Sequence, residues 1–565
     1  MTWKNAIFFS GLWVYMIIVV FAHNFFMGLE DLFPRIPEWA YPLFVFIIPL
    51  AVPITITYKN RQREKRGHKD FGFMDAIGKR KVEPHETKEY QKATYPPIDR
   101  RFLSGIPKDL VLGIKGLRYI YCPLSHDGMN AFLVGNIGSG KSSFLKTWML
   151  TCLYRNRISI ETGRLSGIPY NFFCIDIKGE LYEAVLKIDG HYRAEEDQPI
   201  QVVQPSNRDS WGYDVFYRVH RSNVTETEQI KVVNDIAEAL VEESGDNPYF
   251  SSNARKILRG VLFWGICKRM EFVDIIQQLL RNNFDELVTS IVEEAESERW
   301  TFVFDNLKTF VGKKDNESIQ DILTTMYDKL ACFSSYPDIV YALKDNPYRT
   351  SPAALDDGIT CLDLAVEQSM LETYAPLFRL VSIQVLKHCE NYQESDKRNT
   401  QLIIDEASRI GYINGLDGMM ATLRSKHVGI VLAFQSIHQF LDIYREHRAQ
   451  TILSLCELKI FLSGDGDEET TKYVAGMAGK YVTEKRSYQK DTMLGQKELK
   501  YNEDLRDIID TQSMMELKER GEAIAFIFGH YFRFKKVVYY KDRILGPIYK
   551  EIDVYNKAHI DRGIE

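Results

Sequence analysis

Apolar residues follow two patterns along the chain, and together they predict an α/β fold that a block of helices interrupts. Short continuous apolar runs are typical of strands buried on both faces of a parallel sheet. Such runs occupy residues 131–134, 171–176, 359–364, 402–405, 430–434 and 458–462. From about residue 222 to about residue 350, apolar residues instead recur at helical spacing, beginning behind the capping box Thr225-x-x-Glu228. We therefore expect a parallel α/β sheet that closes around an all-α insertion.

Individual elements can be placed within these two blocks. The insertion is expected to contain helices over residues 253–270, 272–281 and 284–296. Residues 110–121 carry β-favouring side chains broken by glycines, which indicates a hairpin before the first parallel strand.

The N-terminus carries two long uncharged apolar runs, residues 6–22 and 40–58. Each is long enough to cross a bilayer as a helix. A cleaved signal peptide is the alternative for the first run, but no small-x-small cleavage site follows it, and the second run would remain unexplained. The basic stretch 59–69 places the rest of the chain in the cytoplasm by the positive-inside rule. The same stretch could also hold anionic lipid head groups or DNA.

A glycine-rich segment follows the run at 131–134 and has the pattern Gly-x-x-x-x-Gly-Lys-Ser. In such a segment the glycines let the backbone curl so that successive N–H groups point at phosphate oxygens. Lys141 can reach the β- and γ-phosphates of ATP, and Ser142 can ligate Mg²⁺. The strand before the segment and the helix after it favour a nucleotide site over an accidental glycine turn. The candidate nucleotide-binding residues are Gly135, Asn136, Ile137, Gly138, Ser139, Gly140, Lys141, Ser142 and Ser143.

Hydrolysis of ATP also needs a carboxylate on the Mg²⁺ side and a base that orients the attacking water. Asp405 and Glu406 end an apolar strand, at the edge where α/β sheets bind their ligands. Asp176 ends another strand and is an alternative Mg²⁺ ligand, and spacing alone does not decide between Asp405 and Asp176. Gln435 follows the next strand and could sense the γ-phosphate, while Arg424 lies 11 positions earlier. From the residues alone, both are ordinary surface polar residues.

These observations divide the chain into six segments. They are a transmembrane hairpin (1–58), a basic linker (59–105), the first part of a nucleotide-binding domain (106–216), an all-α inserted domain (217–355), the second part of the nucleotide-binding domain (356–545) and a polar tail (546–565). The formal charge of −6 gives no global sign of nucleic-acid binding, so any contact with DNA must be local. The eight cysteines lie far apart without zinc-like spacing, and we interpret them as reduced thiols of a cytoplasmic body.

The order of these motifs resembles that of type IV secretion system coupling proteins of the TraG/TraD type. These are membrane ATPases that deliver conjugative DNA or effector proteins to a secretion channel. The resemblance covers nearly the whole chain. It rests on two N-terminal spans, the phosphate loop, Asp176-Ile177-Lys178-Gly179-Glu180, a helical insertion, residues 402–406 and Ala433-Phe434-Gln435-Ser436. The loop between the two spans is shorter than the periplasmic segment that many relatives carry.

The resemblance implies a RecA-like nucleotide-binding domain with an inserted all-α domain, held at the bacterial inner membrane by its two spans. It also implies a homo-hexameric ring with ATP sites between subunits, working with the components of the secretion channel. The inserted domain would face the cargo. That cargo is either a relaxase bound to single-stranded DNA or a set of protein effectors, and the acidic stretch 293–298 slightly favours contact with protein.

The resemblance also assigns roles to single residues. Lys141 and Ser142 would bind phosphate and Mg²⁺, and Gln435 would be the sensor. Asp405 would be the metal-side carboxylate and Glu406 the catalytic base. Arg424 stands where related ring motors carry an arginine finger, which stabilises transition-state charge in the neighbouring subunit's site.

Two other classes of protein are less compatible with the sequence. An ABC-type transporter subunit would carry a Leu-Ser-Gly-Gly-Gln signature between the phosphate loop and Asp405, and none is present. Two spans are also too few for such a transporter. A non-hydrolysing membrane scaffold would not need Lys141, Glu406 and Arg424.

Overall fold

The computed structural model describes residues 88–107, 110–123, 128–161, 170–177, 181, 200–221, 223–241, 248–313, 317–357, 361–395, 399–463, 467–490, 497–547 and 549–550. Residues Thr87–Glu565 form one compact unit. The predicted transmembrane spans, most of the basic linker and most of the polar tail lie outside the described residues. Within the described part of the chain, no helix has both the length and the apolar character needed to cross a membrane.

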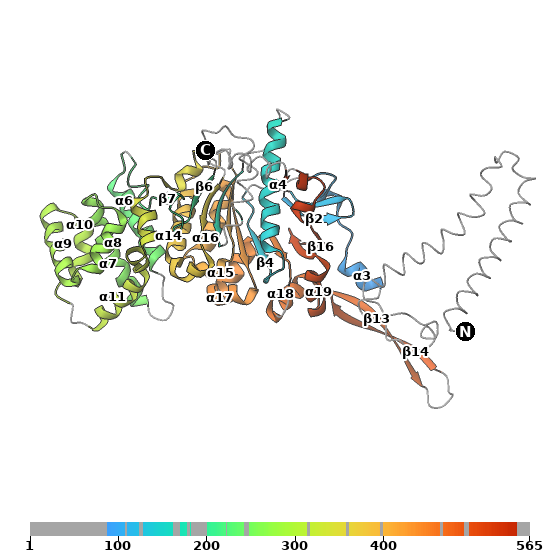
Figure 1. Ribbon diagram of the computed structural model, residues 1–565. Helices are drawn as coiled ribbons and strands as arrows, with labels where there is room; N and C mark the ends of the chain where they lie inside the picture. The colour runs from blue at the N-terminus through green and yellow to red at the C-terminus, as the bar shows by residue number, and fades with distance from the viewer. Residues whose placement is uncertain are drawn as a thin grey trace, which may run out of the picture. The chain divides into compact units, whose positions relative to one another are not determined.

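A twelve-stranded sheet forms the centre of this unit, in the strand order β1-β3-β2-β16-β15-β12-β4-β11-β10-β5-β9-β6 (Figure 1). Neighbouring strands are parallel from β12 to β6 and antiparallel from β1 to β12. The parallel strands are β12 (Leu458–Phe461), β4 (Ala131–Val134), β11 (Val428–Phe434), β10 (Asn399–Ile404), β5 (Tyr170–Asp176), β9 (Cys361–Ala365) and β6 (Ile200–Val203). The antiparallel strands are β1 (Leu103–Ser104), β3 (Arg118–Cys122), β2 (Leu110–Lys115), β16 (His530–Lys536) and β15 (Glu522–Ile527).

The six apolar runs predicted as parallel strands are confirmed as β4, β5, β9, β10, β11 and β12, and β2 with β3 confirms the predicted hairpin. Every residue of β5, β10 and β11 is buried, because helices cover both faces of the sheet. Alternate residues of β4 enter different cores. Phe132 packs in one core against Phe440 of α17 (Ile437–Leu455), and Leu133 lies in the other with Trp148 of α4 (Lys141–Glu161).

Further helices of the unit lie outside the insertion. They are α3 (Lys88–Thr94), α14 (Leu371–Cys389), α15 (Ala407–Ile410), α16 (Leu416–Leu423), α18 (Glu468–Ala478) and α19 (Thr511–Arg520). Because the strands from β12 to β6 are parallel, their carboxyl ends share one edge of the sheet, and several of the connecting helices begin there.

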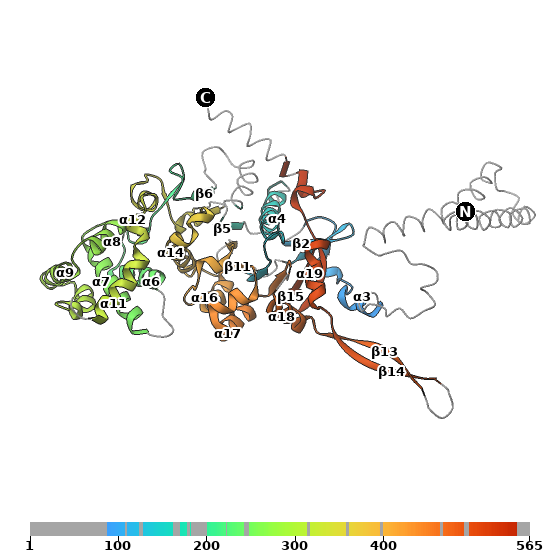
Figure 2. The same cartoon turned by 60° about the horizontal axis from the view of Figure 1, so that its bottom comes forward.

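The chain leaves the sheet after β6 and forms a group of helices before it returns at β9. They are α6 (Glu226–Leu240), α7 (Pro248–Cys267), α8 (Phe272–Arg281), α9 (Phe284–Glu298), α10 (Thr301–Leu307), α11 (Glu317–Leu330), α12 (Cys332–Ser335) and α13 (Pro337–Val340). Both views show them gathered at one end of the unit (Figures 1 and 2). The predicted helix over 272–281 is confirmed in full, and the other two are confirmed with shifted ends. The predicted capping box is present, since Thr225 and Glu228 each accept the other's backbone N–H.

Two short strands close the base of this insertion. β7 (Gly212–Tyr213) pairs in parallel with β8 (Arg349–Thr350). The segment that leads into the helical insertion and the segment that leads out of it therefore lie next to each other. A second two-stranded sheet, β13 (Lys480–Lys490) with β14 (Lys497–Asp507), extends away from the body as a long hairpin between α18 and α19 (Figure 2). The sequence did not predict this hairpin. The division into domains given above stays a prediction, because Thr87–Glu565 forms a single compact unit.

Candidate functional site

The phosphate loop lies at the carboxyl edge of the sheet, between β4 and the first residue of α4. Two of its glycines, Gly138 and Gly140, have φ values of 76° and 89°, a region that glycine enters without steric cost. Hydrogen bonds fix the start of the loop to both neighbouring strands. Gly135 N donates to Phe434 O at the end of β11 (3.0 Å), and Asn136 N donates to Ser463 Oγ just beyond β12 (3.2 Å).

Lys141 brings the loop into contact with the carboxylates at the end of β10. Its Nζ lies 3.2 Å from Asp405 Oδ1 and 3.8 Å from Glu406 Oε1. Both Lys141 (8% exposed) and Asp405 (5% exposed) are buried. Burial raises the pKa of Asp405, and the ammonium of Lys141 acts in the opposite direction. The structure thus brings together three residues that the sequence predicted for one site.

Glu406 has a left-handed backbone conformation, with φ 53° and ψ 52°. Such a conformation is uncommon for a residue with a side chain and costs on the order of 1–3 kcal/mol, and it concentrates at functional sites. Here it turns the chain sharply between β10 and α15, so that two consecutive side chains, Asp405 and Glu406, both face Lys141.

The polar atoms of the loop fit a phosphate group. Among the described residues, the buried Ser139 Oγ has no hydrogen-bond partner, and such an atom is costly to leave unsatisfied. An ammonium, a hydroxyl and the N–H groups of a glycine loop at a helix N-terminus are the donors that bind phosphate oxygens. Ser142 lies half-buried in the first turn of α4, next to Lys141, which suits a hydroxyl ligand of Mg²⁺.

Asp176, the alternative metal ligand, lies beside Asp405 but has a different environment. Asp405 N donates to Ile175 O (3.2 Å), so β5 and β10 bring the two carboxylates to the same edge. Asp176 Oδ2 accepts the backbone N–H of Leu181 (2.5 Å). Only Asp405 of the two forms an ion pair with Lys141 in the described part of the structure, so the geometry favours Asp405. Residues 178–180 of this motif lie outside the described residues.

Gln435 and Arg424 lie at opposite ends of β11. Gln435 follows the carboxyl end and is half-buried, one residue beyond the Phe434 carbonyl that holds the phosphate loop. Arg424 lies before the amino end, half-exposed, with its Nη1 2.6 Å from Glu457 Oε1. Seven residues of strand separate the two ends, a length of about 23 Å. Arg424 therefore cannot reach the phosphate loop of its own chain.

Two lysines that contact the loop were not predicted from the sequence. Lys518 Nζ, from α19, donates to Ile137 O (3.2 Å), and Lys536 Nζ, from the end of β16, donates to Ser139 O (2.6 Å). Neither residue belongs to a motif, and each is separated from the loop by more than 380 positions. No local signal in the sequence could have identified them.

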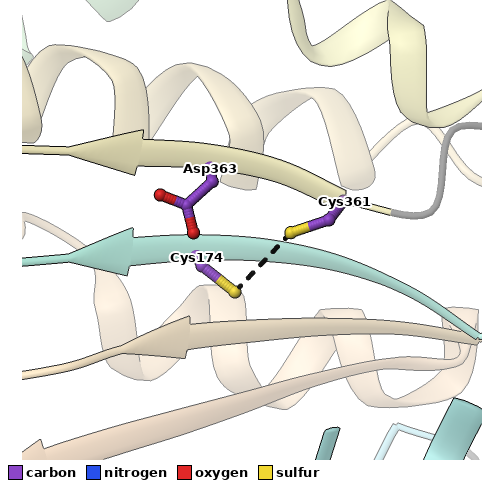
Figure 3. A group of neighbouring side chains, drawn as sticks. All are labelled: Cys174, Cys361 and Asp363. Atoms are coloured by element: carbon purple, nitrogen blue, oxygen red, sulfur yellow. Dashed lines mark hydrogen bonds between the residues drawn. The ribbon is translucent and has the colours of Figure 1, made fainter. Parts of the chain in front are cut away.

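A second cluster of potential metal ligands lies deeper in the sheet (Figure 3). Cys174 of β5 and Cys361 and Asp363 of β9 are fully buried, with the two sulfur atoms 3.9 Å apart. Burial raises the pKa of both Cys174 and Asp363 well above the ordinary values. Sulfur atoms are poor ligands for Mg²⁺, which prefers oxygen. This cluster is therefore not the metal site of the phosphate loop.

Comparison with known proteins identifies the family of this chain and solved structures with a similar fold. Residues 170–561 match the family model described as type IV secretory system conjugative DNA transfer, and the phosphate loop precedes the matched range. Protein VirD4 of Agrobacterium fabrum (strain C58 / ATCC 33970) is 26% identical over 196 residues, which are 34% of this chain and 29% of that protein. The aligned segment is thus less than a third of VirD4.

Two solved structures of the plasmid coupling protein TrwB have a similar fold. The complex with the non-hydrolysable ATP analogue ADPNP gives a TM-score of 0.58 at 16% identity, covering 78% of this chain and 91% of that one. The complex with ADP and Mg²⁺ gives a TM-score of 0.55 at 16% identity, covering 74% and 87%. At this identity the likeness concerns the α/β fold alone.

Proposed function

The chain belongs to the type IV secretory system conjugative DNA transfer family, and from this premise we propose that it is a membrane-anchored coupling ATPase that drives substrate into a type IV secretion channel. Its ATPase core is a RecA-like domain with an inserted all-α domain. The two apolar runs at residues 6–22 and 40–58 anchor it in the bacterial inner membrane. TrwB binds an ATP analogue, and ADP with Mg²⁺, on a similar fold, which supports nucleotide binding here.

The observation that carries this proposal is the convergence of Lys141, Asp405 and Glu406 at the carboxyl edge of the sheet. Without nucleotide, Lys141 balances two carboxylates. In the proposed reaction Lys141 turns to the β- and γ-phosphates of ATP, while Glu406 orients the attacking water and takes its proton. Asp405 and Ser142 would hold Mg²⁺, which supplies charge neutralisation at the phosphates. Gln435, next to the loop, would sense the γ-phosphate.

Arg424 fits this reaction only as a residue supplied by another subunit. It lies at the sheet edge opposite its own phosphate loop, and it is half-exposed. In a ring of subunits, one sheet edge can face the opposite edge of the neighbour, which is the arrangement that an arginine finger requires. The proposal therefore includes a homo-hexamer with its ATP sites at the subunit boundaries.

DNA is the cargo that the family description favours, and we propose that it is delivered as a single strand bound to a relaxase. The helical insertion, α6 to α13, is the proposed recognition surface. Protein effectors are the second candidate cargo, and a specific observation favours them. Glu293, Glu296 and Glu298 are exposed on α9, a charge that attracts basic protein surfaces and repels DNA.

The proposed activity is tested by release of phosphate from ATP by the full chain in detergent, with and without Mg²⁺. We expect Mg²⁺-dependent turnover that Lys141→Ala abolishes, because the variant loses the only loop side chain that can reach the γ-phosphate. Lys472→Ala, at an exposed ion pair of α18, is the matched control and keeps normal turnover. Normal turnover in Lys141→Ala would contradict the assignment.

The cargo is tested separately by capturing the intact protein from its membrane and identifying bound partners. A relaxase among them supports DNA transfer. Effector proteins without a relaxase support the second candidate, and binding of either that strengthens at low salt indicates a charged interface.

A further inference from the structure

The two lysines that contact the phosphate loop come from one corner of the fold, where α19 ends, β15 begins and β16 ends. Lys536 N donates to Gly521 O, the residue after α19, at 2.9 Å. From this corner both ammonium groups reach alternate carbonyls of the loop, Ile137 O and Ser139 O. Among the described residues, neither lysine forms an ion pair with a carboxylate, and each ammonium group instead donates a hydrogen bond to a loop carbonyl.

The position of these two carbonyls determines where the following N–H groups point. A peptide group is planar and trans, so the C=O of one residue and the N–H of the next point in opposite directions. Holding Ile137 O and Ser139 O from outside the loop aims the N–H groups of Gly138 and Gly140 to the inside. Inward N–H groups of the loop, these two among them, contribute to the concave anion site that binds a phosphate.

The two glycines of the loop lie beside the lysines. A Cβ on Gly138 would lie 3.4 Å from Lys518 Nζ, and one on Gly140 would lie 4.0 Å from Lys536 Nζ, and both are ordinary contact distances. Positive φ, rather than lack of space, therefore favours glycine at these two positions.

We propose that Lys518 and Lys536 are positioning residues that hold the phosphate loop in its phosphate-binding conformation. Lys536, the more buried of the two and at the shorter distance, carries most of this effect. The inference rests on the proposed nucleotide site and adds a second role for positive charge there, outside the loop. It also links nucleotide binding to α19 and β16, the elements that follow the β13–β14 hairpin.

Equilibrium binding of ADP to the full chain, measured by calorimetry, tests the proposal with Lys536→Met and Lys518→Met. Each variant loses a hydrogen bond from a charged donor to the loop, and we expect ADP to bind about tenfold more weakly to Lys536→Met and severalfold more weakly to Lys518→Met. Lys536→Arg keeps a donor at the same place and restores most of the affinity. Lys535→Met, an exposed neighbour on β16, is the matched control and leaves affinity unchanged.

Steady-state kinetics distinguish positioning from general loss of structure. A loop that is less well ordered before binding weakens substrate and transition state equally, so KM for ATP rises while kcat changes little. A fall in kcat at unchanged KM would overturn the proposal. Amide hydrogen exchange at Gly138 and Gly140 without nucleotide should be faster in Lys536→Met than in the wild type, and equal exchange would also contradict the proposal. Lys518 is exposed, so its removal leaves the core intact.

ADP binding by the wild type distinguishes the positioning role of the lysines from the nucleotide site itself. If the wild type binds ADP and neither Lys536→Met nor Lys518→Met differs from it, the positioning role of the two lysines is wrong and the proposed ATPase stands. If the wild type binds no ADP, the proposed nucleotide site itself fails.

Discussion

Replacing Glu406 by glutamine should make nucleotide binding tighter while abolishing hydrolysis. Glu406 Oε1 lies 3.8 Å from Lys141 Nζ and competes with phosphate for that ammonium. At this distance the attraction between two unit charges is about 4 kcal/mol at an effective dielectric constant of 20 and about 1 kcal/mol in water. The side chain of Glu406 is 15% exposed, so water screens part of the interaction. We therefore expect a gain of about 1–2 kcal/mol, or roughly 5- to 30-fold in affinity.

The assay is calorimetric titration of the full chain with ADP in the absence of Mg²⁺, so that metal binding does not contribute to the measured affinity. Glu372→Gln is the control, because Glu372 forms an ion pair of similar length, 3.7 Å to Arg409, but its side chain is 91% exposed. It should leave ADP affinity unchanged. Glu406→Gln should also lose ATP turnover, since glutamine cannot accept the proton of the attacking water. Unchanged or weaker ADP binding in Glu406→Gln would refute the view that this carboxylate competes for Lys141.

Two further predictions concern buried carboxyl groups. Because burial raises the pKa of Asp405 above the ordinary value of about 3.9, lowering the pH through the raised pKa protonates it. The gain in ADP affinity that Mg²⁺ provides should therefore be complete above that pKa and should be lost as the pH falls below it. ADP affinity without Mg²⁺ should not show this loss. If calorimetry at several pH values shows the same pH dependence of ADP affinity with and without Mg²⁺, the role of Asp405 is contradicted. Asp363 is fully buried, and neither of its carboxyl oxygens is hydrogen-bonded to a described residue. A buried carboxyl group of this kind destabilises the fold, so we expect Asp363→Val to raise the free energy of unfolding by about 1–3 kcal/mol. A lower melting temperature of the full chain in detergent would show instead that this carboxyl has a structural partner.

The sequence predicted the parallel sheet and the core of the site because both depend on local patterns. Continuous apolar runs mark strands buried on two faces, and the residues just after β4 and β10 must meet at one edge once the strands are parallel. Lys141, Asp405 and Glu406 are therefore found together as expected. The helices of the insertion were predicted for the same reason, since helical periodicity is a local signal.

Features that depend on long-range packing could not be predicted. Lys518 and Lys536 reach the loop only because the antiparallel strands β15 and β16 extend the sheet beside β12. Asp363 lies within a run that was correctly predicted as a strand, but nothing in that run indicates that its carboxyl group lacks a hydrogen-bond partner. The β13–β14 hairpin is rich in charged residues and lacks the apolar alternation by which strands are recognised.

In the proposed ring, each ATP site combines Lys141 and Glu406 of one subunit with Arg424 of its neighbour. ATP turnover of rings assembled from two inactive variants, Arg424→Ala and Glu406→Gln, tests this arrangement. In a mixed ring, an Arg424→Ala subunit keeps its own Lys141 and Glu406 and receives Arg424 from a Glu406→Gln neighbour. We expect the mixture to hydrolyse ATP although neither variant does so alone, and we expect no restored turnover when Lys141→Ala is mixed with Glu406→Gln. Mixed rings of Arg424→Ala and Glu406→Gln that remain as inactive as their components would contradict it.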